Sequence, residues 1–195
     1  METINIQKLI DSDIKFKKIW ESDCKNHRVL YFQLDSNEEG IPAHFHPFGE
    51  DSAIVVQGEL MYDISFEQQL RAEENEIVFG WTNYVHGYHN ERAETLHLLI
   101  FATPEHNESI YDKGRLLEGE HTYIRQAKIT AEMPAIASAR MIFSTNIKNM
   151  AHGDTLIYDC YKKELQVIAY NEQPLHIQPN YLVIQFKDIV TTDSL

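Results

Sequence analysis

The feature that most limits the possible folds is a series of short β-rich runs between residues 28 and 103. The runs are rich in Val, Ile, Leu, Phe and Tyr, and polar connectors separate them; they cover residues 28–34, 53–66, 76–81 and 95–103. Strand-like runs at intervals of about 8–12 residues, with turn residues between them, are typical of an all-β sandwich or barrel. The sequence therefore predicts an all-β domain over residues 20–104.

The remaining part of the chain, residues 105–195, differs in pattern. Residues 105–139 lose the regular alternation, and we expect an irregular segment there with one short helix near residues 110–117. Strand-like runs then return at residues 140–145, 154–161, 164–170 and 179–186. We predict a C-terminal β-rich extension, and three roles stay open for it: extending the sheets of the first domain, pairing with another subunit, or forming a degenerate second copy of that domain.

The charge of the chain excludes several classes of partner. There are 30 acidic residues against 17 basic ones, which gives a formal net charge of −13. Phosphate backbones and anionic membrane surfaces would be repelled, so we expect no nucleic-acid or membrane partner. The first 20 residues are charged and lack the apolar core of a signal peptide, and no later stretch approaches the ~18 apolar residues of a membrane span. We therefore expect a cytoplasmic protein.

A His-x-His pair lies between the first two β-rich runs. Side chains at positions i and i+2 of a strand point to the same face, so His44 and His46 can direct two imidazoles to one point. Such a pair arises by chance about half the time in a chain with 10 histidines among 195 residues. The pair is informative only because other residues follow it at defined spacings.

These other residues form the rest of a two-part pattern. Pro47 ends the strand, an acidic doublet comes next, and Gly58 follows at the turn of a hairpin. One hairpin further along, His86 and Asn90 end a strand-and-turn unit. Chance produces this combination far more rarely than the histidine pair alone.

The pattern resembles the two motifs of the cupin superfamily, G-x5-H-x-H-x3,4-E-x6-G and G-x5-P-x-G-x2-H-x3-N. The resemblance covers residues 40–90, with flanking strands extending it to about 20–104. It implies an antiparallel jelly-roll β-barrel and a divalent metal ion (Fe, Mn, Zn or Ni) bound by His44, His46, His86 and an acidic residue. The residues that match the motifs directly are His44, His46, Gly58, His86 and Asn90.

The acidic ligand is either Glu50 or Asp51. A gap of three residues after His46 selects Glu50, whereas a gap of six residues before Gly58 selects Asp51. We expect Asp51, because it keeps both the longer allowed gap and the count of six.

The second motif departs from the family pattern at three positions. Asn75 and Asn83 stand where the family has glycine, and Trp81 stands where it has proline. Asn tolerates positive φ nearly as well as Gly does, so the two asparagines are mild changes. Trp81 is a larger change and puts an indole ring near the mouth of the barrel.

Several neighbouring side chains are candidates for lining a ligand pocket. Tyr62 and Phe79 lie on runs that should face the cavity, and His97 lies in the run 95–103. The histidines at positions 106, 121, 152 and 176 have no partners at ligand spacing, and we interpret them as structural or exposed.

Three histidines and one acid leave one or two coordination positions open, which is what metal-assisted chemistry requires. The sequence thus favours an enzyme that acts on a small organic molecule, of dioxygenase or of isomerase/lyase type. The alternatives are a non-catalytic barrel that binds or senses a small ligand, and an assembly protein. In each case the resemblance implies a homodimer, since the sheet edges need cover.

Overall fold

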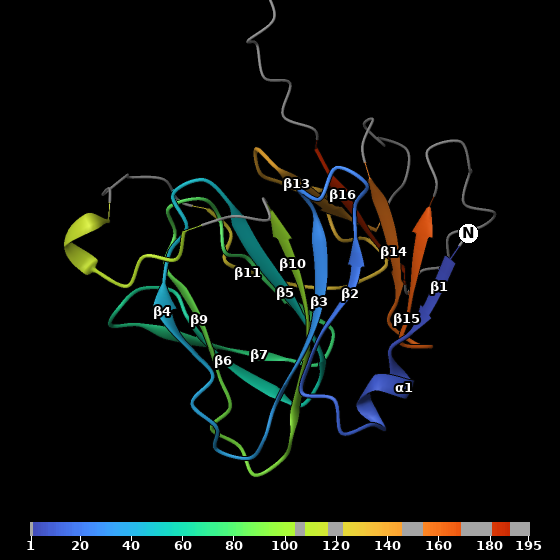
Figure 1. Cartoon of the computed structure of the whole chain (residues 1–195), viewed down its shortest axis with the longest axis horizontal. Helices are drawn as coiled ribbons and strands as arrows, with labels where there is room; N and C mark the ends of the chain where they lie inside the picture. Colours follow the sequence, from blue (N-terminus) through green and yellow to red (C-terminus); the bar gives the residue numbers. More distant parts are fainter. Residues whose placement is uncertain (1, 104–107, 117–122, 146–153, 169–180, 188–195) are drawn as a thin grey trace, which may run out of the picture. The chain divides into compact units, whose positions relative to one another are not determined.

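The computed structural model of the 195-residue chain describes residues 2–103, 108–116, 123–145, 154–168 and 181–187 (Figure 1). The chain divides into two compact units. The larger unit is Lys8–Lys128, and the smaller one combines Met1–Gln7 with Ile129–Leu195. The predicted boundary between residues 104 and 105 lies outside the described residues and stays a prediction.

The larger unit contains two antiparallel sheets. The first has six strands in the order β11-β8-β5-β10-β3-β2. In chain order these are β2 (Phe16–Glu21), β3 (Arg28–Leu34), β5 (Glu50–Gln57), β8 (Glu76–Val78), β10 (Leu96–Thr103) and β11 (Gln126–Lys128). Apart from the three-residue β8 and β11, these strands are six to eight residues long, as their β-branched and aromatic content favours.

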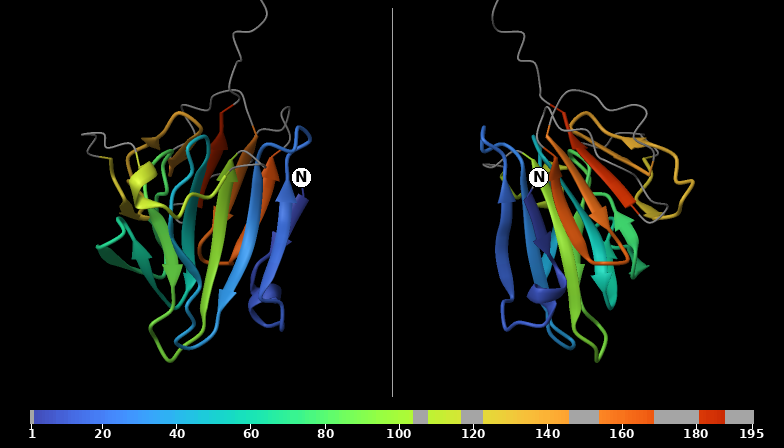
Figure 2. Two further views of the ribbon diagram at one scale, coloured as in Figure 1. Left: turned by 60° about the vertical axis from the view of Figure 1, so that its left-hand side comes forward. Right: turned by 90° about the vertical axis from the view of Figure 1, so that its right-hand side faces the viewer.

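The second sheet has four strands in the order β4-β9-β6-β7. They are β4 (Ile41–His44), β6 (Glu59–Asp63), β7 (Gln69–Glu73) and β9 (His86–His89). Figure 1 labels the strands of both sheets except β8, and Figure 2 shows the two sheets from two further directions. Consecutive strands such as β5 and β6 lie in different sheets, and this exchange is characteristic of a jelly roll.

The turn at Gly58 lies where the sequence predicts it, but it is not the turn of a hairpin, because β5 and β6 belong to different sheets. Gly58, between β5 and β6, has a φ of +91°, a conformation that side chains rarely adopt. Asn75, between β7 and β8, has a φ of 64°. The expectation that Asn75 takes a glycine-like conformation is thereby confirmed.

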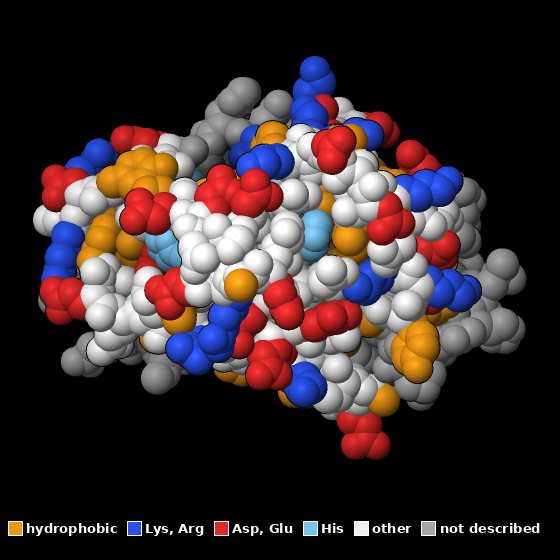
Figure 3. All heavy atoms as spheres, turned by 90° about the horizontal axis from the view of Figure 1, so that it is seen from below, with side chains coloured by type: hydrophobic (Ala, Val, Ile, Leu, Met, Phe, Trp, Pro, Cys, Tyr) orange, Lys and Arg blue, Asp and Glu red, His pale blue; other side chains and the backbone are white. Residues whose placement is uncertain are grey.

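Charged side chains lie across the face of the molecule that Figure 3 shows. Figure 3 shows Asp and Glu side chains scattered over one face, with Lys and Arg side chains between them. The acidic excess of the sequence is thus displayed on this face rather than hidden in the fold.

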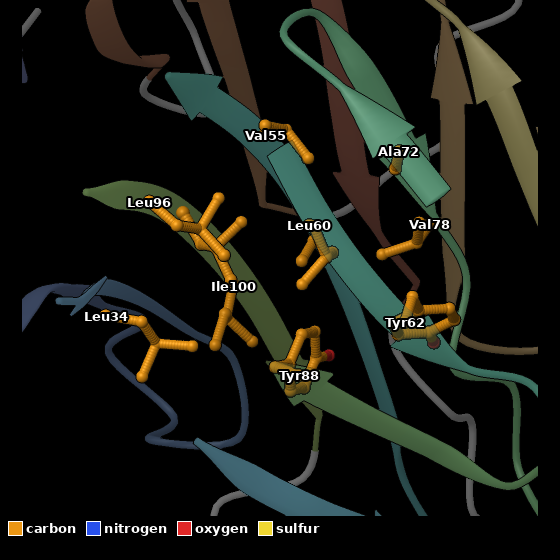
Figure 4. Packing of buried hydrophobic residues seen from close by; sticks show 11 residues of the cluster. Leu34, Val55, Leu60, Tyr62, Ala72, Val78, Tyr88, Leu96 and Ile100 are labelled. Carbon is orange, nitrogen blue, oxygen red and sulfur yellow. The ribbon is translucent and has the colours of Figure 1, made fainter. Parts of the chain in front are cut away.

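The core of the larger unit lies between its two sheets (Figure 4). The four-stranded sheet contributes Leu60, Tyr62, Ala72 and Tyr88. The six-stranded sheet contributes the remaining buried members, which are Leu34, Ala53, Val55, Val78, Leu96, Leu98 and Ile100. We call this set the interior cluster. Burial of this apolar surface, at about 25 cal/mol per Å², is the main stabilising contribution to such a unit.

The smaller unit is one antiparallel sheet in the order β1-β15-β14-β16-β13-β12. Its strands are β1 (Glu2–Asn5), β12 (Ile136–Ala137), β13 (Met141–Ser144), β14 (Thr155–Asp159), β15 (Glu164–Ile168) and β16 (Tyr181–Phe186). The first strand of the chain therefore pairs with β15, with Glu2 opposite Val167 and Asn5 opposite Glu164.

Helical structure in the described part is confined to short segments. These are α1 (Gln7–Ile10) and the 3-10 helix η1 (Lys113–Arg115). The short helix predicted near residues 110–117 is thus a single 3-10 turn, and the side chain of Asp112 caps it by accepting a hydrogen bond from the amide of Gly114. No helix among the described residues is long and apolar enough to cross a membrane.

Candidate metal centre

Three histidines of the larger unit come together at the edge between β4 and β9. His44 ends β4 and is paired directly with His86, the first residue of β9. His46 follows two residues after His44. The ring centroids are 4.3 Å apart for His44 and His86, and 4.9 Å apart for each of the other two pairs. All three side chains are buried, and one ligand nitrogen from each lies within 4.8 Å of the others.

The three imidazoles are oriented in the same way. Their Nδ1 atoms face the carbonyl oxygens of Pro42 at 2.8 Å, Glu108 at 3.1 Å and Tyr84 at 3.0 Å, respectively for His44, His46 and His86. A carbonyl oxygen only accepts, so each Nδ1 carries the hydrogen and donates it. The second nitrogen, Nε2, is thereby turned toward the other histidines, and a hydrogen bond from the opposite ring nitrogen to a carbonyl is typical of metal-ligating histidines.

His86 provides the test of whether the site fits a metal ion. Its side chain is fully buried, yet Nε2 has no hydrogen-bond partner among the described residues. A buried polar atom without a partner is unfavourable unless something else satisfies it. A cation would satisfy this lone pair, so the donor set fits a divalent metal with a preference for nitrogen and oxygen ligands.

Asp51 completes the group on the side of His46. Its Oδ2 lies 3.2 Å from His46 Nε2, and 19% of its side chain is exposed. Nδ1 and Nε2 of His46 both face acceptors, so the protonated ring can donate to Glu108 and to Asp51. Binding of a cation by His46 and Asp51 would require the loss of the proton on Nε2.

Glu50 lies on the opposite face of β5. Asp51 is paired with Ala102, and two residues further Ala53 is paired with Ile100 of the interior cluster. Because successive side chains of a strand alternate between faces, Asp51 shares the interior face and Glu50 does not. The structure thus places Asp51, the expected member of the pair, beside the histidines.

The charge states of the site follow from burial and from these contacts. Burial lowers the pKa of His86 to about 3, and it also lowers the pKa of His44. Burial opposes the charge of His46 as well, but the hydrogen bond and the charge of Asp51 outweigh it and raise the pKa. Burial raises the pKa of Asp51, and the hydrogen bond from His46 overcomes this and holds it below its ordinary value. Burial thus favours the neutral forms of His44 and His86, whereas the contact between His46 and Asp51 favours the charged forms of both.

The connection between β8 and β9 presses against the site. An added Cβ at Gly80 would lie 2.3 Å from the carbonyl oxygen of Asp51 and 3.0 Å from the ring of His86. Further along, Asn83 has a φ of 64°, and its amide donates to the carbonyl of His46 at 2.7 Å. Asn83 thus takes the glycine-like conformation that we expected for it. Its hydrogen bond joins the loop before His86 to the backbone of His46.

Tyr111 is a neighbour of the site that the sequence did not reveal. Its ring stacks on His44 with a centroid distance of 5.2 Å, and the side chain is still 55% exposed. A β-bridge between Phe45 and Ile110 holds it there. Tyr111 lies in the irregular segment after residue 104, where no motif assigns a register, so the local pattern carries no signal for it.

The three candidate pocket residues occupy different places. Tyr62 belongs to the interior cluster and lies next to Tyr88 (Figure 4). Phe79 is buried and stacks on Trp81 with a centroid distance of 4.7 Å. His97 bonds Tyr31 through Nδ1 at 2.7 Å, on the face of β10 opposite to Leu96 and Leu98. A role of these residues in ligand binding stays a prediction. The histidines at 106, 121, 152 and 176 lie outside the described residues.

Comparisons with known proteins bear on the fold. The sequence matches no family model and no curated protein. A cupin 2 conserved barrel domain protein from Leptotrichia buccalis has a similar structure, with 15% sequence identity, a TM-score of 0.56, and coverage of 95% of this chain and 96% of that one. A protein with a double-stranded β-helix domain from Klebsiella pneumoniae is 19% identical and has a TM-score of 0.44, with coverage of 52% of this chain and 89% of that one.

The polyketide cyclase RemF from Streptomyces resistomycificus is 16% identical and has a TM-score of 0.44, with coverage of 52% of this chain and 72% of its own. The match to the Leptotrichia protein extends beyond the two sheets of the larger unit to nearly the whole chain. Together with the jelly-roll sheets, it shows that this chain has the fold of the cupin superfamily.

Proposed function

We propose that His44, His46, His86 and Asp51 bind a divalent metal ion, and that the protein uses it to act on a small organic molecule. The observation that carries the proposal is the shared orientation of the histidines, whose Nδ1 atoms are held by carbonyls. A metal bound there would supply a Lewis-acidic centre with an open coordination position.

The protein's own residues prepare this site in two ways. The carbonyls of Pro42, Glu108 and Tyr84 fix each tautomer, so the ligand nitrogens need no rearrangement to bind. Burial keeps His44 and His86 neutral at physiological pH, which leaves one proton, that on His46, to be released when a cation binds.

The first experiment is elemental analysis of protein purified without a nickel column and without chelator. We expect about one equivalent of Fe, Mn, Zn or Ni per chain. His86→Ala should lose the metal, whereas His89→Ala, three residues along the same strand, should keep it, because His89 instead pairs with Asp63 at 2.6 Å. Equal metal content in both variants would refute the assignment.

The identity of the metal then directs the assay of activity. Iron together with consumption of dioxygen by candidate substrates would select the dioxygenase type, and Zn or Mn without oxygen consumption would select the isomerase or lyase type. Tight binding of a small molecule that is recovered unchanged after hours would instead favour the non-catalytic sensing barrel.

A further inference from the structure

Arg125 reaches from the segment before β11 into the larger unit, where three backbone carbonyls hold its guanidinium. Nε donates to Phe79 at 2.9 Å, Nη1 to Ile64 at 3.1 Å and Nη2 to Val85 at 2.5 Å. These carbonyls come from the ends of three different strand segments. The guanidinium is therefore fixed in position, and two of its five N–H groups remain for another acceptor.

The positive charge of Arg125 has no carboxylate partner in the part of the chain that the structure describes. The guanidinium carbon lies 5.9 Å from the ring centroid of Tyr62 and 5.4 Å from that of Tyr84. The faces of aromatic rings attract a cation but do not neutralise it. In a protein with a net charge of −13, a fixed guanidinium without an acidic partner is a natural receptor for an anion.

Tyr62 adds a second donor at the same place. Its side chain is fully buried, and its hydroxyl makes no hydrogen bond of standard geometry among the described residues, although the guanidinium of Arg125 lies near enough to interact with it. Burial raises the pKa of Tyr62 to about 12, against the opposing influence of Arg125, so the hydroxyl keeps its proton and can donate it. A buried hydroxyl without a partner is unfavourable, and phenylalanine would fill the same space without that disadvantage.

The position of this pair relative to the metal centre follows from the strand register. Tyr62 of β6 lies opposite Tyr88 of β9, and Tyr88 is two residues from His86. The ring centroids are 5.5 Å apart for Tyr62 and Tyr88, and 6.1 Å apart for Tyr88 and His86. Tyr62 and His86 are thus diagonal neighbours on one face, roughly 7–8 Å apart along the backbone. Val85, which Arg125 holds, directly precedes His86.

We infer that Arg125 and Tyr62 bind the carboxylate of a small organic acid, with the other end of the acid directed toward the histidines. The inference rests on the proposed function for the site to which that other end is directed. Planar guanidinium and carboxylate groups match in geometry, and the hydroxyl of Tyr62 supplies an additional donor.

The test is calorimetric titration with lactate, malate and succinate, each compared with its amide, on metal-free and Zn-loaded protein. We expect each acid to bind at least about tenfold more tightly than its amide. Arg125→Gln should weaken acid binding by about tenfold to a hundredfold and Tyr62→Phe by about tenfold, with amide affinity unchanged. Tyr31→Phe is the matched control, because its hydroxyl bonds His97 instead, and it should bind like the wild type.

Tyr62→Phe separates this role from a structural one. Since the hydroxyl makes no hydrogen bond of standard geometry, its removal should not lower the thermal stability or the metal content, while acid affinity falls. If Arg125→Gln does not fold, Tyr62→Phe alone decides. Equal affinity for acids and amides, no acid binding, or wild-type acid affinity in Tyr62→Phe would overturn the inference. A wild type that binds acid in the metal-free state but never binds metal would refute the proposed function and leave the acid site standing.

Discussion

At the scale of single residues, the two nitrogens of each site imidazole have separate tasks. Nδ1 holds the ring in place through a carbonyl, and Nε2 faces the centre. Only His46 differs, because its Nε2 already contacts a carboxylate. Loss of the Asp51 side chain should therefore weaken the metal centre, whereas loss of the neighbouring Glu50 side chain should not.

The first prediction concerns these two acids. Asp51→Asn should weaken metal binding by at least about tenfold, because it removes a charged oxygen beside His46. Glu50→Gln should change the affinity by less than about threefold, since its side chain lies on the other face of β5. Competition with a chromophoric chelator measures both constants. A larger effect from Glu50→Gln would show that the acid has been wrongly assigned.

The second prediction concerns the stability of the metal-free protein in acid. The pKa of His86 is about 3, below its ordinary value of 6.5. Between these values the unfolded chain binds a proton that the folded chain does not, so stability falls as the pH drops below 6.5. The loss should reach about 3 kcal/mol at pH 4.

Urea unfolding from pH 7 to pH 4 measures this effect against His86→Leu. The variant should lack that share of the pH dependence, while contributions from the other groups remain in both proteins. Identical pH slopes in the two proteins would contradict the burial-induced shift of His86.

The sequence predicted part of the residue-level picture. The resemblance to the cupin motifs, rather than the spacing alone, predicted that His44, His46 and His86 come together; the pairing of β4 with β9 that brings His44 beside His86 leaves no local pattern. The sequence could not show to which face of β10 His97 points, since every residue of β10 is buried and such a run does not reveal which face is interior. Arg125 was missed for another reason: its contacts reach 40 to 61 residues back along the chain.

At the scale of elements, the connection between β8 and β9 positions the third histidine. Gly80 leaves room for the carbonyl of Asp51 and for the ring of His86. Arg125 bonds this connection at Phe79 and Val85, and Asn83 within it bonds the carbonyl of His46. The connection thus has little freedom to accommodate an extra methyl group.

The third prediction is therefore that Gly80→Ala displaces two ligands at once. We expect a loss of stability of about 1–3 kcal/mol and a metal affinity reduced by at least about tenfold. Gly114→Ala is the control, because its added Cβ would meet only the exposed Asp112 side chain at 3.3 Å. Thermal unfolding and metal titration of both variants check this. Wild-type metal affinity in Gly80→Ala would show that the connection between β8 and β9 accommodates the added methyl group without displacing the ligands.

The strands were predictable where their own composition defines them. The run 28–34 is β3 without change, and the run 95–103 is β10 with one residue fewer. β1, β2 and β7 were not anticipated, because none of them is a continuous apolar run and each contains at least one charged residue. β2 and β7 pair with the neighbouring strands β3 and β6, whereas β1 pairs with the distant β15, and that pairing leaves no local pattern.

At the scale of the whole molecule, we propose that the chain forms a homodimer, as the sequence led us to expect. The sheets of the larger unit end in edge strands, and β2 at one such edge carries Phe16, 60% exposed. Exposed edges of this kind are commonly covered by a partner. The large negative charge of each copy opposes association.

The fourth prediction combines these opposing effects. Light scattering after size exclusion should give twice the mass of the chain, and the dimer should be more stable in 0.3 M than in 0.02 M salt, at roughly these concentrations, because ions screen the repulsion. A monomer under both conditions would exclude the dimer. A dimer that weakens with salt would show that ion pairs, rather than apolar contacts, hold it.

The pairing of β1 with β15 also sets an order of events during synthesis. Residues 2–5 leave the ribosome before their partners, residues 164–167, have been made. The first strand must therefore wait unpaired while the larger unit, residues 8–128, is completed between them. Contacts between such distant residues form late and slowly. An affinity tag fused directly before Glu2 would thus interfere with a late step of folding, even though β1 is synthesised before the strand with which it pairs.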